Sequence, residues 1–177
     1  IKKILKNKVR IHKETKIESV LINLSRKSIW LDSLSCSFYY KSILHKKNKV
    51  IEKIDPIHFF KSIKNNIEIK NMEKSHLTDG VALTKFLFWV KKNFKKKKIT
   101  EISAQKKLEG FRRMDPSYKF PSFSTISGSG PNSAIIHYKA SNKTNRALKK
   151  GDLYLVDSGG QYSFGTTDVT RTVSLDN

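Results

Sequence analysis

Apolar and polar positions change their spacing along the chain, and this change divides the sequence into two parts. In the first part, short apolar runs alternate with basic turns at residues 20–24, 28–31, 37–40 and 49–54. Runs of this length predict the strands and short helices of an α/β unit. Asp55-Pro56 interrupts the pattern, because the residue before a proline is pushed from helical toward extended backbone. We therefore expect a boundary shortly after this pair, with one domain over residues 1–64 and the next over residues 65–177.

The clearest periodicity in the second part predicts a helix over residues 67–94. Its apolar residues recur at the three- and four-residue spacing that gathers them on one face. They are Ile69, Met72, Leu77, Val81, Leu83, Leu87, Phe88 and Val90. A second helix is predicted to begin near Thr100, which can cap it, and to end at Asp115-Pro116.

Beyond Asp115-Pro116, β-branched residues and turn residues predict strands. FSTISGSGP (123–131) has the pattern of a strand that runs into a loop, and SAIIHY (133–138) that of a short strand. LYLVDSGG (153–160) and FGTTDVTRTV (164–173) predict two strands joined by a tight turn. The second part is therefore expected to combine two helices with antiparallel strands.

Two aspartates occupy these last strands, where carboxylates are unusual. A hairpin with its turn at residues 161–164 has its midpoint between Tyr162 and Ser163, which places Asp157 directly opposite Asp168. Side chains in such a pair have Cβ atoms roughly 4.5–5.5 Å apart. Two carboxylates so close would repel each other or share a proton, unless a divalent cation neutralises them. Alternatively, Asp157 caps the turn that follows it and Asp168 faces water. The spacing alone does not choose between these two interpretations.

Charge, cysteine and hydropathy narrow the function classes. The net charge of +21 comes almost entirely from lysines spread along the 177 residues. Solvated lysines on ordinary faces explain this pattern, so nucleic acid is not an expected partner. The single cysteine, Cys36, excludes an intrachain disulfide, and no apolar run reaches the roughly 18 residues of a membrane span.

His137 stands alone among apolar residues, where a histidine is more often structural than catalytic.

Two runs of residues resemble the first half of the catalytic domain of the Xaa-Pro aminopeptidases, which belong to the creatinase/methionine-aminopeptidase ("pita-bread") family. They are FPSFSTISGSGPNSAIIHY (120–138) and LYLVDSGGQYSFGTTDVTRTV (153–173). The helical segments before them are also similar to the two helices that open that domain. Residues 1–60 resemble, less specifically, the end of a creatinase-type N-terminal domain.

The resemblance implies an α+β fold, in which a partial pita-bread catalytic domain of two opening helices and antiparallel strands follows the end of a creatinase-type α/β domain. It implies that Asp157 and Asp168 are metal ligands and that His137 contacts the substrate. The implied cofactors are two divalent metal ions. Mn²⁺ is the expected metal, since hard carboxylate ligands suit it, with Zn²⁺ or Co²⁺ as alternatives.

The implied activity is hydrolysis of the bond before a proline at the second position of a peptide. The resemblance further implies a cytoplasmic enzyme without a membrane partner, homodimeric in its full-length form. The family site needs one His and two Glu beyond the aspartates, yet no His follows His137 and no Glu follows Glu109. We therefore expect an incomplete chain that is inactive alone. The alternative function is a non-catalytic pita-bread protein that binds nucleic acid or an acidic protein.

Overall fold

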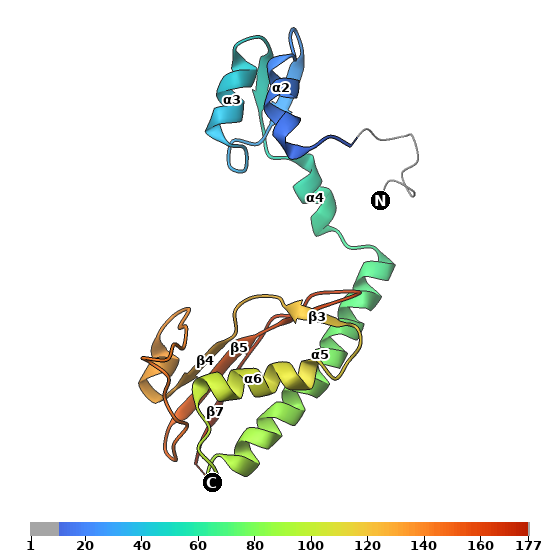
Figure 1. Cartoon of the computed structure of the whole chain (residues 1–177). Coiled ribbons are helices and arrows are strands. Elements are labelled where there is room, and N and C mark those ends of the chain that lie inside the picture. The colour runs from blue at the N-terminus through green and yellow to red at the C-terminus, as the bar shows by residue number, and fades with distance from the viewer. Residues whose placement is uncertain (1–10, 177) are drawn as a thin grey trace. The chain divides into compact units, whose positions relative to one another are not determined.

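The chain divides into two compact units between Ile63 and Lys64, and a computed structural model describes residues 11–176. The first unit contains a two-stranded parallel sheet, β1 (Ser28–Leu31) and β2 (Lys49–Glu52). A parallel pair needs a crossover connection, and α3 (Phe38–His45) supplies it. This arrangement confirms the expected α/β unit (Figure 1).

Three shorter helical elements complete the described part of the first unit. The 3₁₀ turn η2 (Glu14–Lys16) leads into α2 (Ile17–Ile22), which contacts α3. The helix α4 (Pro56–Ser62) begins where the apolar pattern breaks. Its start is fixed by Asp55, whose carboxylate accepts a hydrogen bond from the backbone N–H of Ile57 at 2.9 Å.

The second unit opens with two capped helices, as the periodicity predicts. The first, α5 (Asn66–Asn93), begins with a capping box formed by Asn65 and Glu68. The second, α6 (Glu101–Arg112), begins with Thr100, whose hydroxyl accepts from the N–H of Ser103. Within residues 11–176, no helix has the length and apolar character needed to cross a bilayer.

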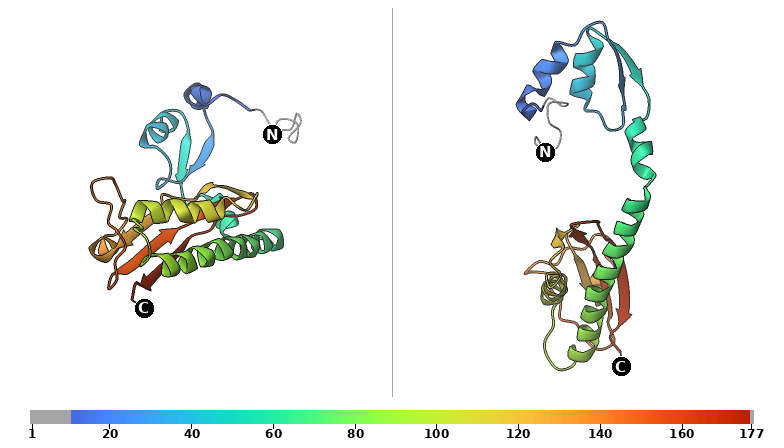
Figure 2. Two further views of the ribbon diagram at one scale, coloured as in Figure 1. Left: turned by 60° about the horizontal axis from the view of Figure 1, so that its bottom comes forward. Right: turned by 90° about the vertical axis from the view of Figure 1, so that its right-hand side faces the viewer.

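In the described part of the second unit, five short strands follow the helices and form two sheets. Strands β4 (Ile126–Ser129), β5 (Leu153–Ser158) and β7 (Val169–Ser174) make an antiparallel sheet in the order β4-β5-β7. Strand β3 (Tyr118–Pro121) pairs with β6 (Gly160–Tyr162) in a separate antiparallel pair. Figure 2 shows β5 between its two neighbours and both helices beside this sheet.

The strand expected over residues 133–138 is absent, and that prediction was wrong. The segment instead contains the 3₁₀ helix η3 (Gly130–Ala134), followed by a turn. Gly130 takes a φ of 56°, and the ring of Pro131 then fixes φ at the second residue of the helical turn. The apolar pair that suggested a strand, Ile135 and Ile136, is 52% and 86% exposed. These side chains do not pack against a sheet, so the apolar run was not evidence for a strand.

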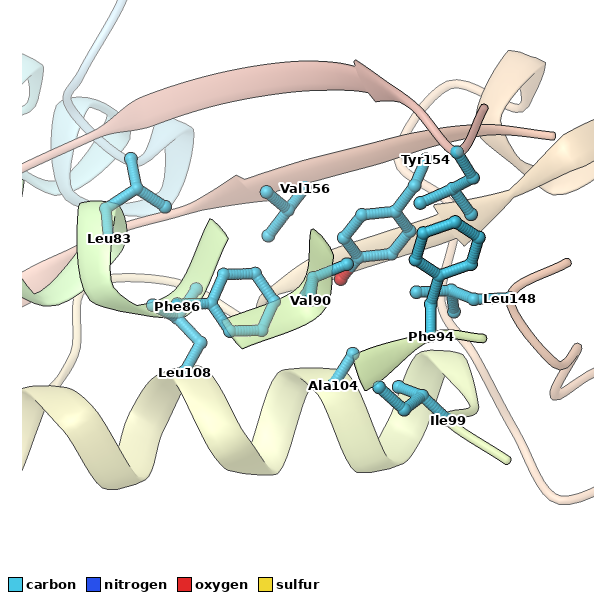
Figure 3. Close-up of a cluster of buried hydrophobic side chains, with 11 residues drawn as sticks. Leu83, Phe86, Val90, Phe94, Ile99, Ala104, Leu108, Leu148, Tyr154 and Val156 are labelled. Atoms are coloured by element: carbon cyan, nitrogen blue, oxygen red, sulfur yellow. The ribbon is translucent and has the colours of Figure 1, made fainter. Parts of the chain in front are cut away.

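The hydrophobic core lies between the two helices and β5. Leu83, Phe86 and Val90 of α5 meet Ala104 and Leu108 of α6 and the inward residues of β5, Tyr154 and Val156 (Figure 3). Phe86, Val90, Leu108 and Val156 are fully buried. Because side chains alternate along a strand, Asp157 lies on the face of β5 that points away from this core.

Candidate metal centre

Asp157 stands near the end of β5 with one oxygen that has no protein partner. Its backbone is fixed on both sides, because it pairs with Ile126 of β4 and with Thr170 of β7. The side chain is half-buried, and Oδ1 is buried without a hydrogen bond to any residue that the structure describes. A buried acceptor without a partner is costly. Coordination of a hard divalent cation would satisfy this oxygen, so the position fits a metal ligand.

The hairpin that carries the aspartates is present, but the predicted register was wrong by two residues. Asp157 pairs with Thr170 and not with Asp168. The same register continues toward the turn, where the N–H of Thr167 donates to the carbonyl of Gly160 at 2.9 Å. The turn is therefore centred between Ser163 and Phe164, one residue later than predicted.

Asp168 is exposed and lies one residue before β7. The register places it across from Gly159, which is on the same face of the hairpin as Asp157. The two aspartates are thus diagonal neighbours, a relation that typically separates residues by roughly 7–8 Å. Two carboxylates at this separation can reach a pair of cations about 3.5–4 Å apart. Of the alternative interpretation, Asp168 does face water, whereas Asp157 Oδ1 accepts no hydrogen bond from the described turn.

The register is fixed by Thr167, the buried residue that precedes Asp168. Its hydroxyl accepts from the N–H of Gly160 at 2.9 Å, and its carbonyl accepts from the hydroxyl of Ser122 at 2.8 Å. A Cβ on Gly159 would lie 1.9 Å from the carbonyl oxygen of Thr167. Only a glycine at position 159 allows the two strands to approach this closely.

A buried ion pair connects both helices to the end of β5. The guanidinium of Arg112 on α6 donates from Nε and Nη2 to the two carboxylate oxygens of Asp79 on α5, at 2.6 and 3.0 Å. Both residues are 2% exposed. The hydroxyl of Tyr162 also donates to Asp79, at 2.7 Å. Burial, and then this hydrogen bond to a carboxylate, raise the pKa of the Tyr162 phenol.

A second buried carboxylate, Glu101 at the first turn of α6, organises the loop that carries His137. Glu101 accepts hydrogen bonds from the N–H groups of Ser129 and Arg146, at 2.8 and 2.9 Å. The hydroxyl of Tyr138 donates to it at 2.9 Å, and the side chain of Asn132 at 3.0 Å. Burial and then Glu101 raise the pKa of Tyr138, although a hydrogen bond with Thr144 acts in the opposite sense.

His137 itself is exposed, and its φ of 54° places it in the left-handed region. It follows η3, whereas Asp157 pairs with Ile126 at the opposite end of β4. Among residues 11–176, no group of three or more His, Cys, Asp or Glu side chains is close enough to hold a metal ion. The candidate centre within this chain therefore consists of the two aspartates.

The buried roles of Asp79, Glu101 and Arg112 were not predicted from the sequence, although the apolar pattern contained a signal for each. Asp79 lies four residues before Leu83, so it falls on the apolar stripe of α5. In the same way, Arg112 lies four residues after Leu108 on α6, and Glu101 lies seven residues before Leu108. A charged residue within an apolar stripe must find a buried partner, and this requirement could have identified all three.

Comparisons with known proteins agree with this architecture. Residues 70–177 match the model of metallopeptidase family M24, and residues 1–68 match that of the creatinase/prolidase N-terminal domain. A Xaa-Pro aminopeptidase of Drosophila melanogaster is 41% identical over 156 residues, which are 88% of this chain and 25% of that protein. Xaa-Pro aminopeptidase 1 of Dictyostelium discoideum is 45% identical over 151 residues, 83% of this chain and 24% of that protein. The chain thus spans about a quarter of the length of these relatives.

Solved structures of an X-prolyl aminopeptidase and of a prolidase are similar to this chain. An X-prolyl aminopeptidase from Caenorhabditis elegans, described as a cytosolic enzyme with a di-nuclear active site, has a TM-score of 0.87 and 32% identity; the match covers 97% of this chain and 29% of that one. A prolidase from Pyrococcus horikoshii has a TM-score of 0.73 and 26% identity, with 96% and 46% of the two chains covered.

Proposed function

Because the chain belongs to metallopeptidase family M24, we propose that Asp157 and Asp168 are two carboxylate ligands of a dinuclear metal site. The observation that carries this proposal is the buried, unpartnered Oδ1 of Asp157 on the sheet face away from the core. Asp168 lies on the same face of the hairpin, one step along the strand. Mn²⁺ is the proposed metal, since carboxylate oxygens are hard ligands. The remaining ligands would come from parts of the intact enzyme outside this chain.

The proposed reaction of the intact enzyme is hydrolysis of the peptide bond before a penultimate proline. Two relatives named as Xaa-Pro aminopeptidases, 41% and 45% identical, support this substrate class over other peptides. Bound divalent metals would supply an activated water and stabilise the negative charge that develops on the carbonyl oxygen. With two of the five expected ligands, this chain alone would be inactive. We also propose a cytoplasmic location and a homodimer for the full-length form.

In that reaction, some residues of this chain would bind the metals and another would contact the substrate. Asp157 and Asp168 would bring negative charge to the site and hold the metals in place. His137 would contact the substrate, since its turn exposes the imidazole and the Glu101 network holds the adjacent Tyr138. An imidazole can donate to or accept from a peptide group near neutral pH.

The test uses the complete enzyme that contains this chain, loaded with Mn²⁺ and given a peptide with proline at its second position. The expected result is cleavage before the proline, with removal of the metal by a chelator abolishing it. Asp157→Ala should lower kcat/KM by at least about a hundredfold, because one ligand is lost outright. No cleavage by the loaded enzyme, or equal cleavage by Asp157→Ala, would contradict the proposal.

A further inference from the structure

Arg112 connects the helices to the residues that directly follow Asp157. In addition to its pair with Asp79, its Nη2 donates to the hydroxyl of Ser158 at 3.1 Å, and its Nη1 donates to the carbonyl of Gly159 at 3.3 Å. Ser158 is fully buried, so the guanidinium replaces water as its partner. A planar guanidinium with several fixed donors can make all these contacts at once.

The same segment is joined to the backbone before Asp168. The carbonyl of Gly159 accepts a second hydrogen bond from the N–H of Ser122, at 3.1 Å. The hydroxyl of Ser122 in turn donates to the carbonyl of Thr167 at 2.8 Å. Thr167 and Gly160 are connected by two further bonds of 2.9 Å. A continuous series of hydrogen bonds therefore connects the buried guanidinium to the residues that directly follow Asp157 and to Thr167, which directly precedes Asp168.

We propose that Arg112 is a positioning residue for the metal centre: it holds the backbone next to Asp157 and, through Gly159 and Ser122, the backbone next to Asp168. This inference rests on the proposed metal-ligand function of the two aspartates. Groups that orient metal ligands commonly change metal affinity by 10- to 100-fold when they are altered. Asp79 serves to orient the guanidinium and to neutralise its charge within the core.

Lysine should not replace Arg112 in this role, although it preserves the charge. A single ammonium group can pair with Asp79, but it cannot donate at the same time to Ser158 and to Gly159 in the geometry of the guanidinium fork. The neighbouring Arg113 provides a matched control. It is exposed, and among the residues that the structure describes its ion pair is with Glu109 on the same helix face, so Arg113→Lys makes the same chemical change without touching β5.

The experiment titrates Mn²⁺ into the ¹⁵N-labelled chain and follows paramagnetic broadening of the amide signals of residues 156–159 and 167–170. For Arg112→Lys, we expect the Mn²⁺ concentration at half-broadening to rise about tenfold or more. Arg113→Lys should match the wild type. Ser158→Ala removes one of the two contacts that Arg112 makes with residues 158–159 and keeps the ion pair, so it should shift the midpoint in the same direction by a smaller factor.

Tyr162→Phe separates positioning from general loss of stability. It removes the hydroxyl that donates to Asp79 but leaves the contacts of Arg112 with Ser158 and Gly159 in place. We expect a lower melting temperature with an unchanged Mn²⁺ midpoint. If Tyr162→Phe shifts the midpoint as far as Arg112→Lys does, the role of Arg112 is structural only and the inference is overturned.

Two results distinguish failure of this inference from failure of the proposed function. If Asp157→Ala leaves cleavage by the Mn²⁺-loaded complete enzyme unchanged, the metal-ligand proposal fails, and the inference fails with it. If the wild-type chain shows localised broadening and Arg112→Lys has the same midpoint, only the positioning inference fails. Amide hydrogen exchange gives a metal-free measurement, because loosening by Arg112→Lys should speed exchange of the Gly160 and Thr167 N–H groups. Unchanged exchange at both would also contradict the inference.

Discussion

At the scale of single residues, Gly159 and Thr167 decide where the two aspartates stand. The absence of a side chain at Gly159 lets the Thr167 carbonyl approach, and the Thr167 hydroxyl then accepts from the Gly160 N–H. These contacts set the hairpin register that makes Asp157 and Asp168 diagonal neighbours. The geometry of the candidate metal centre therefore depends on two residues that are not themselves ligands.

Gly159→Ala should be strongly destabilising, because the new Cβ would lie 1.9 Å from the backbone oxygen of Thr167 and neither strand can move freely. We expect a loss of about 3 kcal/mol in the free energy of unfolding, measured by urea denaturation. Gly80→Ala provides the control, since a Cβ at that position in α5 meets no atom within 4 Å. It should stabilise the chain by about 0.5–1 kcal/mol. Equal effects of the two substitutions would contradict this account of the register.

At the scale of elements, the apolar periodicity predicted the helices well and the strand register less well. A helix of 28 residues such as α5 repeats its pattern many times, so its boundaries were predicted closely. Hairpin register instead depends on where a turn is centred, and a shift of one residue moves every pair by two. The shift kept Asp157 and Asp168 on one face of the hairpin, so their common face agrees with the prediction although their exact pairing does not.

The isolated apolar run at Ile135 and Ile136 led to the wrong prediction of a strand. It belongs to a loop that is held by a hydrogen bond from the Tyr138 hydroxyl to the carboxylate of Glu101. Nothing local in the run reveals this, since the partners of Glu101 are as far away as Arg146. The polar contacts that shape the site connect residues distant in sequence. The apolar periodicity does not predict such contacts. The one sign of them in the sequence is a charged residue at an otherwise apolar position of a helix.

Glu101→Gln tests how far this loop depends on one carboxylate. The buried carboxylate accepts from four donors, and an amide, with one oxygen and an NH₂ group, would leave some of them unsatisfied. We expect a loss of at least about 2 kcal/mol in the free energy of unfolding, with faster amide exchange around His137. Glu109→Gln on the same helix removes only an exposed pair with Arg113 and should cost less than about 0.5 kcal/mol. Similar losses in both variants would refute the role given to Glu101.

At the scale of the whole molecule, the two faces of strand β5 have different surroundings: one face belongs to the hydrophobic core, and the other carries the candidate metal ligand Asp157. One side of the strand packs Tyr154 and Val156 against the two helices, and the other side presents Asp157. The family assignment gives this arrangement its meaning, since the matched region begins in α5 and includes every strand of the sheets in the second unit. On this side of the strand, we propose that the two aspartates jointly bind a divalent metal.

Mapping of the Mn²⁺ site by amide line broadening tests that claim most directly. In the wild-type chain, broadening should concentrate on residues 156–159 and 167–170. Asp157→Asn and Asp168→Asn should each weaken it strongly, because an amide is a poorer ligand than a carboxylate for this hard cation. Asp176→Asn, at an exposed position after β7, serves as the control and should leave it unchanged. Broadening that persists in both aspartate variants, or that spreads evenly over the acidic residues of the chain, would contradict the metal-ligand assignment.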